Sequence, residues 1–226
     1  MQVLKYGWQT RRLSWVVGAS LLAMFAVVLV GDGGFQVNWD TVYEPKYVLY
    51  MELVFLLLST VAAVLIEPLS AQWEGSSSRA RGVALFSLCV TFVGIWLVAA
   101  VAMGQLLRIY PANIVVLMML TSSTLVASVT LGLSPWIGPY WAGVSSLSFY
   151  AACIAIQGFM PAYRSLVPLG DSRLIPAPTE PHVVLTSVLA LALCVLSHWT
   201  TGGLRQGRRI VNCLLYTSPS PRDGLL

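Results

Sequence analysis

The chain has 226 residues, of which 57% are hydrophobic and only 10% are charged. An average soluble domain carries roughly 25% charged residues, so this composition excludes an ordinary soluble domain, a disordered chain and a disulfide-stapled secreted domain. The net charge of +4 does not indicate binding to nucleic acid, because the positive residues flank apolar runs and form no cluster on a soluble face. The sequence therefore predicts an all-α, polytopic membrane protein embedded in the lipid bilayer.

Six apolar runs are long enough to cross a bilayer as helices, which takes about 20 residues with a range of about 17–25. We predict spans at about 13–30, 47–66, 83–107, 112–133, 142–160 and 183–199. The first run could instead be a cleaved signal peptide, but it is long, and GDGG follows it in place of a small-residue cleavage site. The fourth and fifth runs flank the proline-bearing SPWIGPYW, so they form either two spans, which we favour, or a re-entrant element.

The distribution of lysine and arginine predicts that both termini lie in the cytoplasm. With the N-terminus inside, the inner segments hold Lys5, Arg11, Arg12, Arg79, Arg81, Arg205, Arg208 and Arg209. The outer segments hold only Lys46, Arg108, Arg164 and Arg173. An excess of positive residues marks the cytoplasmic side, so we expect a cell-membrane protein with this orientation. Aromatic residues near the span ends fit the two interfaces: Trp15, Tyr47, Tyr110, Trp136, Tyr140, Trp141 and Trp199.

We treat residues 1–212 as a single transmembrane domain. The last stretch, CLLYTSPSPRDGLL at 213–226, matches nothing before it and resembles non-native, adaptor-derived sequence. Three of the four cysteines lie inside apolar runs without CxxC spacing, which favours buried hydrophobes over metal ligands. The N-terminal MQVLKYGWQTRR has apolar and basic residues at helical spacing; it is either a helix on the inner membrane surface or a basic tail.

Two loops stand out between the predicted spans. The inner loop EPLSAQWEGSSSRARG combines charged and apolar residues that suit docking to another protein: Glu67, Leu69, Trp73, Glu74, Arg79 and Arg81. A solvated connector is the alternative. The outer segment at about 161–182 holds five prolines, which interrupt helices. It therefore forms broken half-helices over an outer mouth or a plain ordered loop.

The sequence contains no motif for catalysis, a cofactor or a metal. There is no phosphate-cradling GxxxxGK[ST] and no HExxH. His182 and His198 are sixteen residues apart, or about 24 Å along one helix, so they cannot share a metal, and we expect each at the membrane interface. An enzyme is therefore not expected.

Isolated polar groups inside the spans are the remaining candidates. Glu52 lies within the second run, where a charge is costly and indicates a functional site by default. It could serve an outer vestibule or proton coupling, or it could pair with Lys46 or Arg108. The fourth run carries a stripe of three hydroxyl residues and the fifth carries three polar residues, which suit either helix packing or a pathway lining: Thr121, Thr124, Ser128, Ser145, Ser148 and Gln157.

This layout resembles the membrane (permease) subunits of type-2 ABC transporters, especially the compact bacterial ones of actinobacterial style. The basic N-terminus, the inner loop EPLSAQWEGSSSRARG between spans two and three, and the long outer segment between spans five and six occur in the order of that family. The likeness is mainly topological, because the ERERGT-like run of better-known members is absent.

The resemblance implies a separate nucleotide-binding ATPase that docks against Glu67–Arg81. It also implies a homodimer or heterodimer of permeases that encloses the translocation pathway. Two other functions remain open at this point. One is a membrane structural or assembly subunit without a pathway of its own, and the other is an ion-coupled transporter that uses Glu52.

Overall fold

The computed structural model describes residues 11–31, 33–37, 46–68, 80–108, 112–159 and 181–204. Within these ranges the chain forms six helices and two short strands. In chain order they are α2 (Leu13–Val30), β1 (Gly34–Val37), β2 (Lys46–Leu49), α3 (Tyr50–Leu65), α5 (Ala80–Leu106), α6 (Ala112–Ile137), α7 (Pro139–Phe159) and α8 (Pro181–Thr201). The expected surface helix at the N-terminus, the proline-rich outer segment and the tail at 213–226 lie outside the described residues.

The helices coincide with the six predicted runs to within a few residues. Among the described residues, α2, α5, α6, α7 and α8 are long and apolar enough to cross a membrane, whereas α3 is apolar but has only 16 residues. A helix satisfies all its backbone groups internally, which lipid requires. The protein is therefore mostly helical and of the membrane-embedded kind.

A two-stranded antiparallel sheet precedes α3, and the prediction of an all-α fold omitted it. Strand β1 pairs with β2 so that Gly34 faces Leu49 and Val37 faces Lys46. The second apolar run was therefore predicted too long, since residues 47–49 are extended and the helix begins at Tyr50. A short run rich in β-branched and aromatic residues is compatible with either a strand or a helix. Pairing with β1 selects the strand.

Helices α6 and α7 are joined by Gly138 alone. Gly138 has φ +87°, which glycine adopts at little cost, and Pro139 then occupies the first position of α7, where its missing N–H is harmless. Each of the two helices contains an apolar window of at least 18 residues. The pair is thus long enough for two spans, the alternative that we favoured over a re-entrant element.

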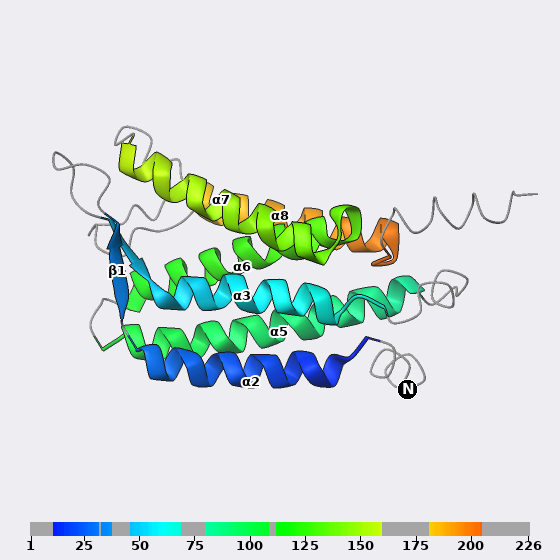
Figure 1. Cartoon of the computed structure of the whole chain (residues 1–226), viewed down its shortest axis with the longest axis horizontal. Coiled ribbons are helices and arrows are strands. Elements are labelled where there is room, and N and C mark those ends of the chain that lie inside the picture. The colour runs from blue at the N-terminus through cyan, green and yellow to red at the C-terminus, as the bar shows by residue number, and fades with distance from the viewer. Residues whose placement is uncertain are drawn as a thin grey trace, which may run out of the picture.

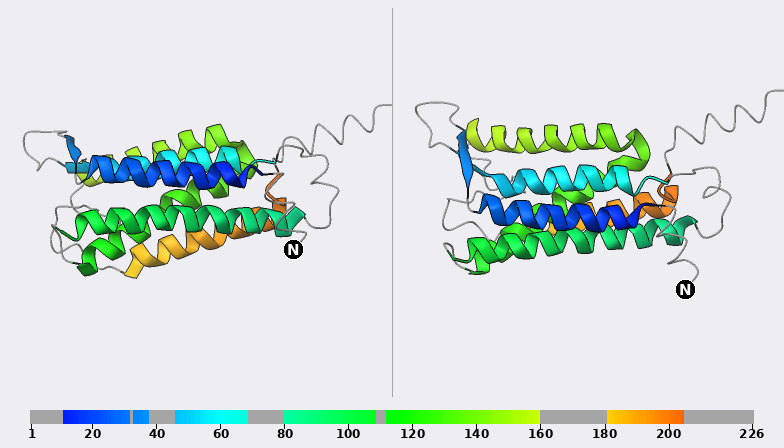
Figure 2. Two further views of the ribbon diagram at one scale, coloured as in Figure 1. Left: turned by 90° about the horizontal axis from the view of Figure 1, so that it is seen from below. Right: turned by 60° about the horizontal axis from the view of Figure 1, so that its bottom comes forward.

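The helices lie roughly along one long axis, with the β1–β2 hairpin at one end (Figure 1). Helices α2, α3 and α7 pack in that order, while α5 packs against α2 and α8. Helix α6 lies in the middle and packs against α3, α5, α7 and α8, as the two views of Figure 2 show. The hairpin end contains the hairpin and the start of α3. The opposite end, here named the Arg11 end, contains the start of α2 and the final turns of α3 and α8.

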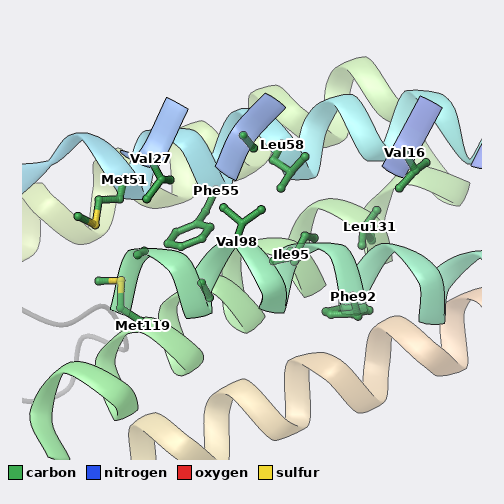
Figure 3. Close-up of a cluster of buried hydrophobic side chains, with 14 of the residues drawn as sticks. Val16, Val27, Met51, Phe55, Leu58, Phe92, Ile95, Val98, Met119 and Leu131 are labelled. Carbon is green, nitrogen blue, oxygen red and sulfur yellow. The ribbon is translucent and has the colours of Figure 1, made fainter. Parts of the chain in front are cut away.

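The core consists of apolar side chains packed mainly between α2, α3, α5 and α6. Phe55 extends from α3 toward Val98 of α5, with Val27 and Met119 close by (Figure 3). A second buried cluster joins β2, α6 and α7 and includes Val48, Leu125, Val126, Tyr150, Cys153 and Ile154. These two clusters fix the central position of α6.

Burial falls steeply from the central helix to the outer ones. The most apolar window of α6 is 61% buried, but that of α8 is only 17% buried. The exposed side chains on α2 and α8 are largely apolar, with Leu22 at 71% and Leu193 at 65% exposure. Soluble monomers rarely expose such large apolar surfaces, so this distribution indicates contact with lipid or with another membrane chain.

Candidate functional site

A buried carboxylate and a buried phenol meet near the hairpin end. Glu52 lies in the first turn of α3, and Tyr150 of α7 donates a hydrogen bond to its Oε2. Glu52 is 9% exposed and Tyr150 is 4% exposed. Buried ionisable groups need a partner of this kind because an unpaired charge in an apolar environment is very costly. The pair therefore satisfies the one acidic side chain that the sequence places inside a span.

The surroundings of this pair are apolar. Tyr150 belongs to the buried cluster with Val48, Leu125 and Cys153, so the phenol that contacts Glu52 is itself surrounded by largely apolar side chains. In an environment of low dielectric constant, hydrogen bonds to a charged group are stronger than in water. The sequence had offered Lys46 and Arg108 as partners. The Lys46 side chain lies outside the described part, Arg108 is exposed at the end of α5, and Tyr150 was not foreseen.

The predicted polar stripe of α6 takes part in contacts between helices. The Thr121 carbonyl accepts a hydrogen bond from Ser187 of α8 at 3.2 Å, and the Thr124 hydroxyl accepts one from Nε1 of Trp96 on α5 at 3.1 Å. Ser128 is buried, and its hydroxyl has no hydrogen-bond partner among the described residues. These positions favour the packing interpretation of the stripe over the pathway lining.

On α7, the Ser148 hydroxyl bonds back to its own helix at the Val144 carbonyl, while the neighbouring Ser146 receives a hydrogen bond of 2.8 Å from Thr130 of α6. Ser145 is half-buried, and the Gln157 side chain lies outside the described residues.

The Arg11 end is built around a fully buried arginine. Arg11 has 0% exposure, and its guanidinium donates to the carbonyl of Ile66 at 3.4 Å and to that of Gly202 at 2.9 Å. Ile66 follows α3 directly, and Gly202 follows α8. The sequence placed Arg11 in a surface segment, so this prediction is wrong. Positive charge is favoured at helix C-termini, where backbone carbonyls lack helical donors, and two such termini meet here.

A small polar pocket lies beside Arg11. Its volume is about 10 Å³, room for about one water molecule, and its lining includes Glu67, Ser134, His198 and Gly203. Its walls come from the ends of α3, α6 and α8 and the start of α7. It is therefore a meeting point of four helices.

His198 lies in the last turn of α8 and is enclosed by protein, with 1% exposure, a burial that the sequence did not predict. Its Nδ1 lies 3.2 Å from the carbonyl of Cys194, and since a carbonyl oxygen can only accept, Nδ1 is the donor in this contact. The sequence alone could not show this, because periodicity says which face of a helix a residue occupies but not what covers that face. The His182 side chain lies outside the described residues.

Of the residues predicted to dock an ATPase, the structure describes Glu67 and Arg81. Glu67 is half-buried at the pocket, and Arg81 is exposed in the first turn of α5. The Arg81 guanidinium lies 5.8 Å from the ring centroid of Trp199, a cation–π arrangement between α5 and α8. Leu69, Trp73, Glu74 and Arg79 lie outside the described part of the chain.

Exposed aromatic side chains surround the Arg11 end. They occur on α2, at the α6–α7 junction and at the end of α8: Trp15, Trp136, Tyr140, Trp141 and Trp199. Trp136 also bonds through Nε1 to Ser197 of α8 at 2.8 Å. Tryptophan and tyrosine are favoured at the level of lipid headgroups, so this end is suited to a membrane–water interface.

No group of three or more His, Cys, Asp or Glu side chains that could hold a metal ion occurs in the described ranges. Comparison of the chain with models of protein families, with curated proteins and with solved structures finds no match.

Proposed function

We propose that the chain is the membrane subunit of an ATP-driven transporter of the type-2 ABC kind. It crosses the cell membrane six times, places both termini in the cytoplasm and takes its energy from a separate ATPase. Two copies, identical or related, enclose the translocation pathway. The support comes from the geometry of the Arg11 end and from the order of segments in the sequence.

The distribution of basic residues supports this orientation. Arg12 and Arg81 are both exposed at the Arg11 end. Six further basic residues belong to the same side in the sequence: Lys5 and Arg11 precede α2, Arg79 lies between α3 and α5, and Arg205, Arg208 and Arg209 follow α8. Positive residues near helix ends mark the cytoplasmic side. The ring of exposed aromatics at the same end supports an interface at this level. The Arg11 end thus faces the cytoplasm in this proposal.

The single observation that carries the proposal is the position of the segment between α3 and α5. At the Arg11 end, α6 and α7 are joined by Gly138 alone, whereas residues 66–79 connect α3 to α5. Of the two connections between helices at this end, only that segment is long enough to contact another protein. Its first residues are tied to α2 and α8 through Arg11. A motor that moves this segment would therefore act on three helices at once.

The α3 helix, with 16 residues, is shorter than a typical span. The strand β2 continues it directly at the hairpin end, and Ile66–Pro68 continue it at the other. Val48, Leu49 and Ile66 are buried in the protein. Non-helical backbone is tolerated at membrane depth where protein covers it, so α3 with its two extensions fits a sixth crossing.

Purification of the tagged chain from its native membranes in mild detergent tests the proposal. We expect an ATPase with a phosphate-binding loop among the co-purified chains, and we expect a double variant, Trp73→Ala with Glu74→Ala, to lose it. The matched control is Arg108→Gln, an exposed change at the hairpin end, which should keep the ATPase. A complex of unrelated membrane chains without an ATPase would instead indicate a structural or assembly subunit.

Labelling of intact cells tests the orientation separately. A cysteine at Ser77 should react with a membrane-impermeant thiol reagent only after the cells are opened. A cysteine at Phe35, which is exposed on β1, should react in intact cells, and the parent chain gives the background. Reaction of Ser77→Cys from outside would overturn the proposal, because no cytosolic motor could reach that segment.

The Glu52–Tyr150 pair favours a second candidate, an ion-coupled transporter. A buried carboxylate bonded to a phenol across two helices can lose or gain a proton as the helices separate. Transport that continues without an ATPase but stops in Glu52→Gln would establish this function in place of the first.

A further inference from the structure

We propose that Arg11 is a latch that holds the Arg11 end closed by joining the start of α2 to the C-terminal ends of α3 and α8. Its release would widen the pocket beside the half-exposed Glu67 and open it to the cytoplasm as far as His198. This inference deepens the proposed function, because it identifies the inner closure on which a motor would act.

The bonds of Arg11 connect parts of the chain that are distant in sequence. Two of its acceptors, the carbonyls of Ile66 and Gly202, are 55 and 191 residues away, just after the ends of α3 and α8. A guanidinium is a planar fork that can donate to two acceptors at once. A lysine at this position would keep the charge but could not span both carbonyls with the same rigidity.

The backbone after α8 is shaped around this side chain. Gly203 has φ +70°, and a Cβ at this residue would lie 2.7 Å from Nη1 of Arg11. Any other residue there would collide with the guanidinium and also strain the backbone. The contact therefore depends on a glycine that both makes the turn and leaves room for Arg11.

The contact holds two walls of the pocket in place. Gly203 lines the pocket and touches Arg11, while Ile66 lines the pocket and accepts its hydrogen bond. Removal of Arg11 would free both walls. Glu67 is already half-exposed, so Ser134 and His198 are the buried polar side chains that water would then reach, while the wall residues Ala63, Pro135 and Pro139 have apolar side chains.

The energetics fit a contact that can open. A buried guanidinium loses its hydration and regains part of it from its partners, which for Arg11 include the carbonyls of Ile66 and Gly202 at two helix C-termini. On release it returns to water, and its rehydration offsets part of the cost of breaking these contacts. Two packings of similar stability are what a ligand or motor needs in order to shift a conformational equilibrium. Ile66 is also the first residue of the segment that we propose the ATPase contacts.

The test uses the full chain in inside-out membrane vesicles, without any ATPase. A cysteine at Ser134, a pocket residue that is 9% exposed, reports opening by its rate of reaction with an impermeant thiol reagent. Cys89 and Cys213 are replaced by serine and the buried Cys194 by alanine, and the buried Cys153 near Glu52 remains as an internal control.

We expect Arg11→Gln to raise the labelling rate of Ser134→Cys by about tenfold or more, because hydrogen bonds from a charged group contribute about this factor. Arg11→Lys should raise the rate by less. The matched control Arg12→Gln removes the neighbouring, exposed arginine and should leave the rate unchanged. In all of these variants Cys153 should remain unlabelled.

Two results would overturn the latch. If Arg11→Gln leaves Ser134→Cys protected, Arg11 does not close this end. If Ser134→Cys and Cys153 become reactive together, Arg11 supports the whole fold and is no local latch. Neither result depends on a motor. A further experiment adds ATP to the purified complex of the chain with its ATPase. If Arg11→Gln raises labelling but ATP does not change it, the latch stands and the proposed function is contradicted.

Discussion

The phenol of Tyr150 on α7 donates a hydrogen bond to the carboxylate of Glu52 on α3, across 98 residues of sequence. Both side chains are buried, so the bond joins two helices in the interior of the protein. The hydroxyl of Tyr150 thus supplies Glu52 with a polar partner from another helix.

Substitution of Tyr150 by phenylalanine should destabilise the protein. The change removes one hydroxyl and leaves a buried carboxylate without this donor, at a cost of about 1.5–3 kcal/mol. Thermal unfolding in detergent would measure the effect. Tyr140→Phe is the matched control, because Tyr140 is 69% exposed, and it should unfold like the parent. Equal stability of the two variants would show that the hydrogen bond contributes nothing.

Glu52→Gln should keep the fold, because the amide oxygen of glutamine can still accept the hydrogen bond from Tyr150. Under the proposed function, ATP-driven transport should persist in this variant, since the energy comes from a separate chain. Flux into or out of vesicles containing the complete complex is the measurement. Loss of transport with an unchanged melting temperature would favour ion coupling at Glu52.

Ser128→Ala should leave stability unchanged or raise it. The Ser128 hydroxyl is buried and has no hydrogen-bond partner among the described residues, and a buried unsatisfied group costs about 1–3 kcal/mol. Ser146→Ala is the comparison, because its hydroxyl accepts a 2.8 Å hydrogen bond from Thr130, and this variant should lose about 1 kcal/mol. The reverse order of stability would mean that Ser128 binds water or a ligand, which would restore its predicted place in a pathway.

Gly143→Ala should destabilise the contact between α3 and α7. A Cβ at Gly143 would collide with Thr60 of α3, and overpacking of a tight interface costs about 1–3 kcal/mol. Gly104→Ala is the control, because a Cβ there would meet nothing within 4 Å, and alanine is the better helix former. Its melting temperature should be equal to or above that of the parent. An equally stable Gly143→Ala would mean that α3 and α7 can move apart at little cost.

The positions of the helices could be predicted because the bilayer allows few alternatives. A long apolar run in lipid must form a helix to satisfy its backbone, and the six runs found by composition are the six helices of the described chain. The hairpin was missed because residues 46–49 continue into the second apolar run without a break. Only the partner strand distinguishes the extended segment from a first helical turn.

The polar contacts could not be predicted to the same degree. Glu52 was recognised because a carboxylate in an apolar run is unusual whatever surrounds it. Tyr150, Arg11 and His198 were not, because each occurs at a place in the sequence where such a residue is ordinary. Arginine before a first span has a common interpretation at the membrane surface, and Tyr150 lies in the middle of α7, where an aromatic side chain is ordinarily part of the apolar packing.

Composition and the order of apolar runs were sufficient to establish a helical, membrane-embedded chain, since that result depends on the solvent and on local hydrogen bonding. The partners of Arg11, Glu52 and His198 followed only from the packing of the helices, because hydrogen bonds between residues as far apart as Arg11 and Gly202 depend on how helices lie against one another. Sequence periodicity describes one helix at a time, and it contains no information on which neighbour will cover each face.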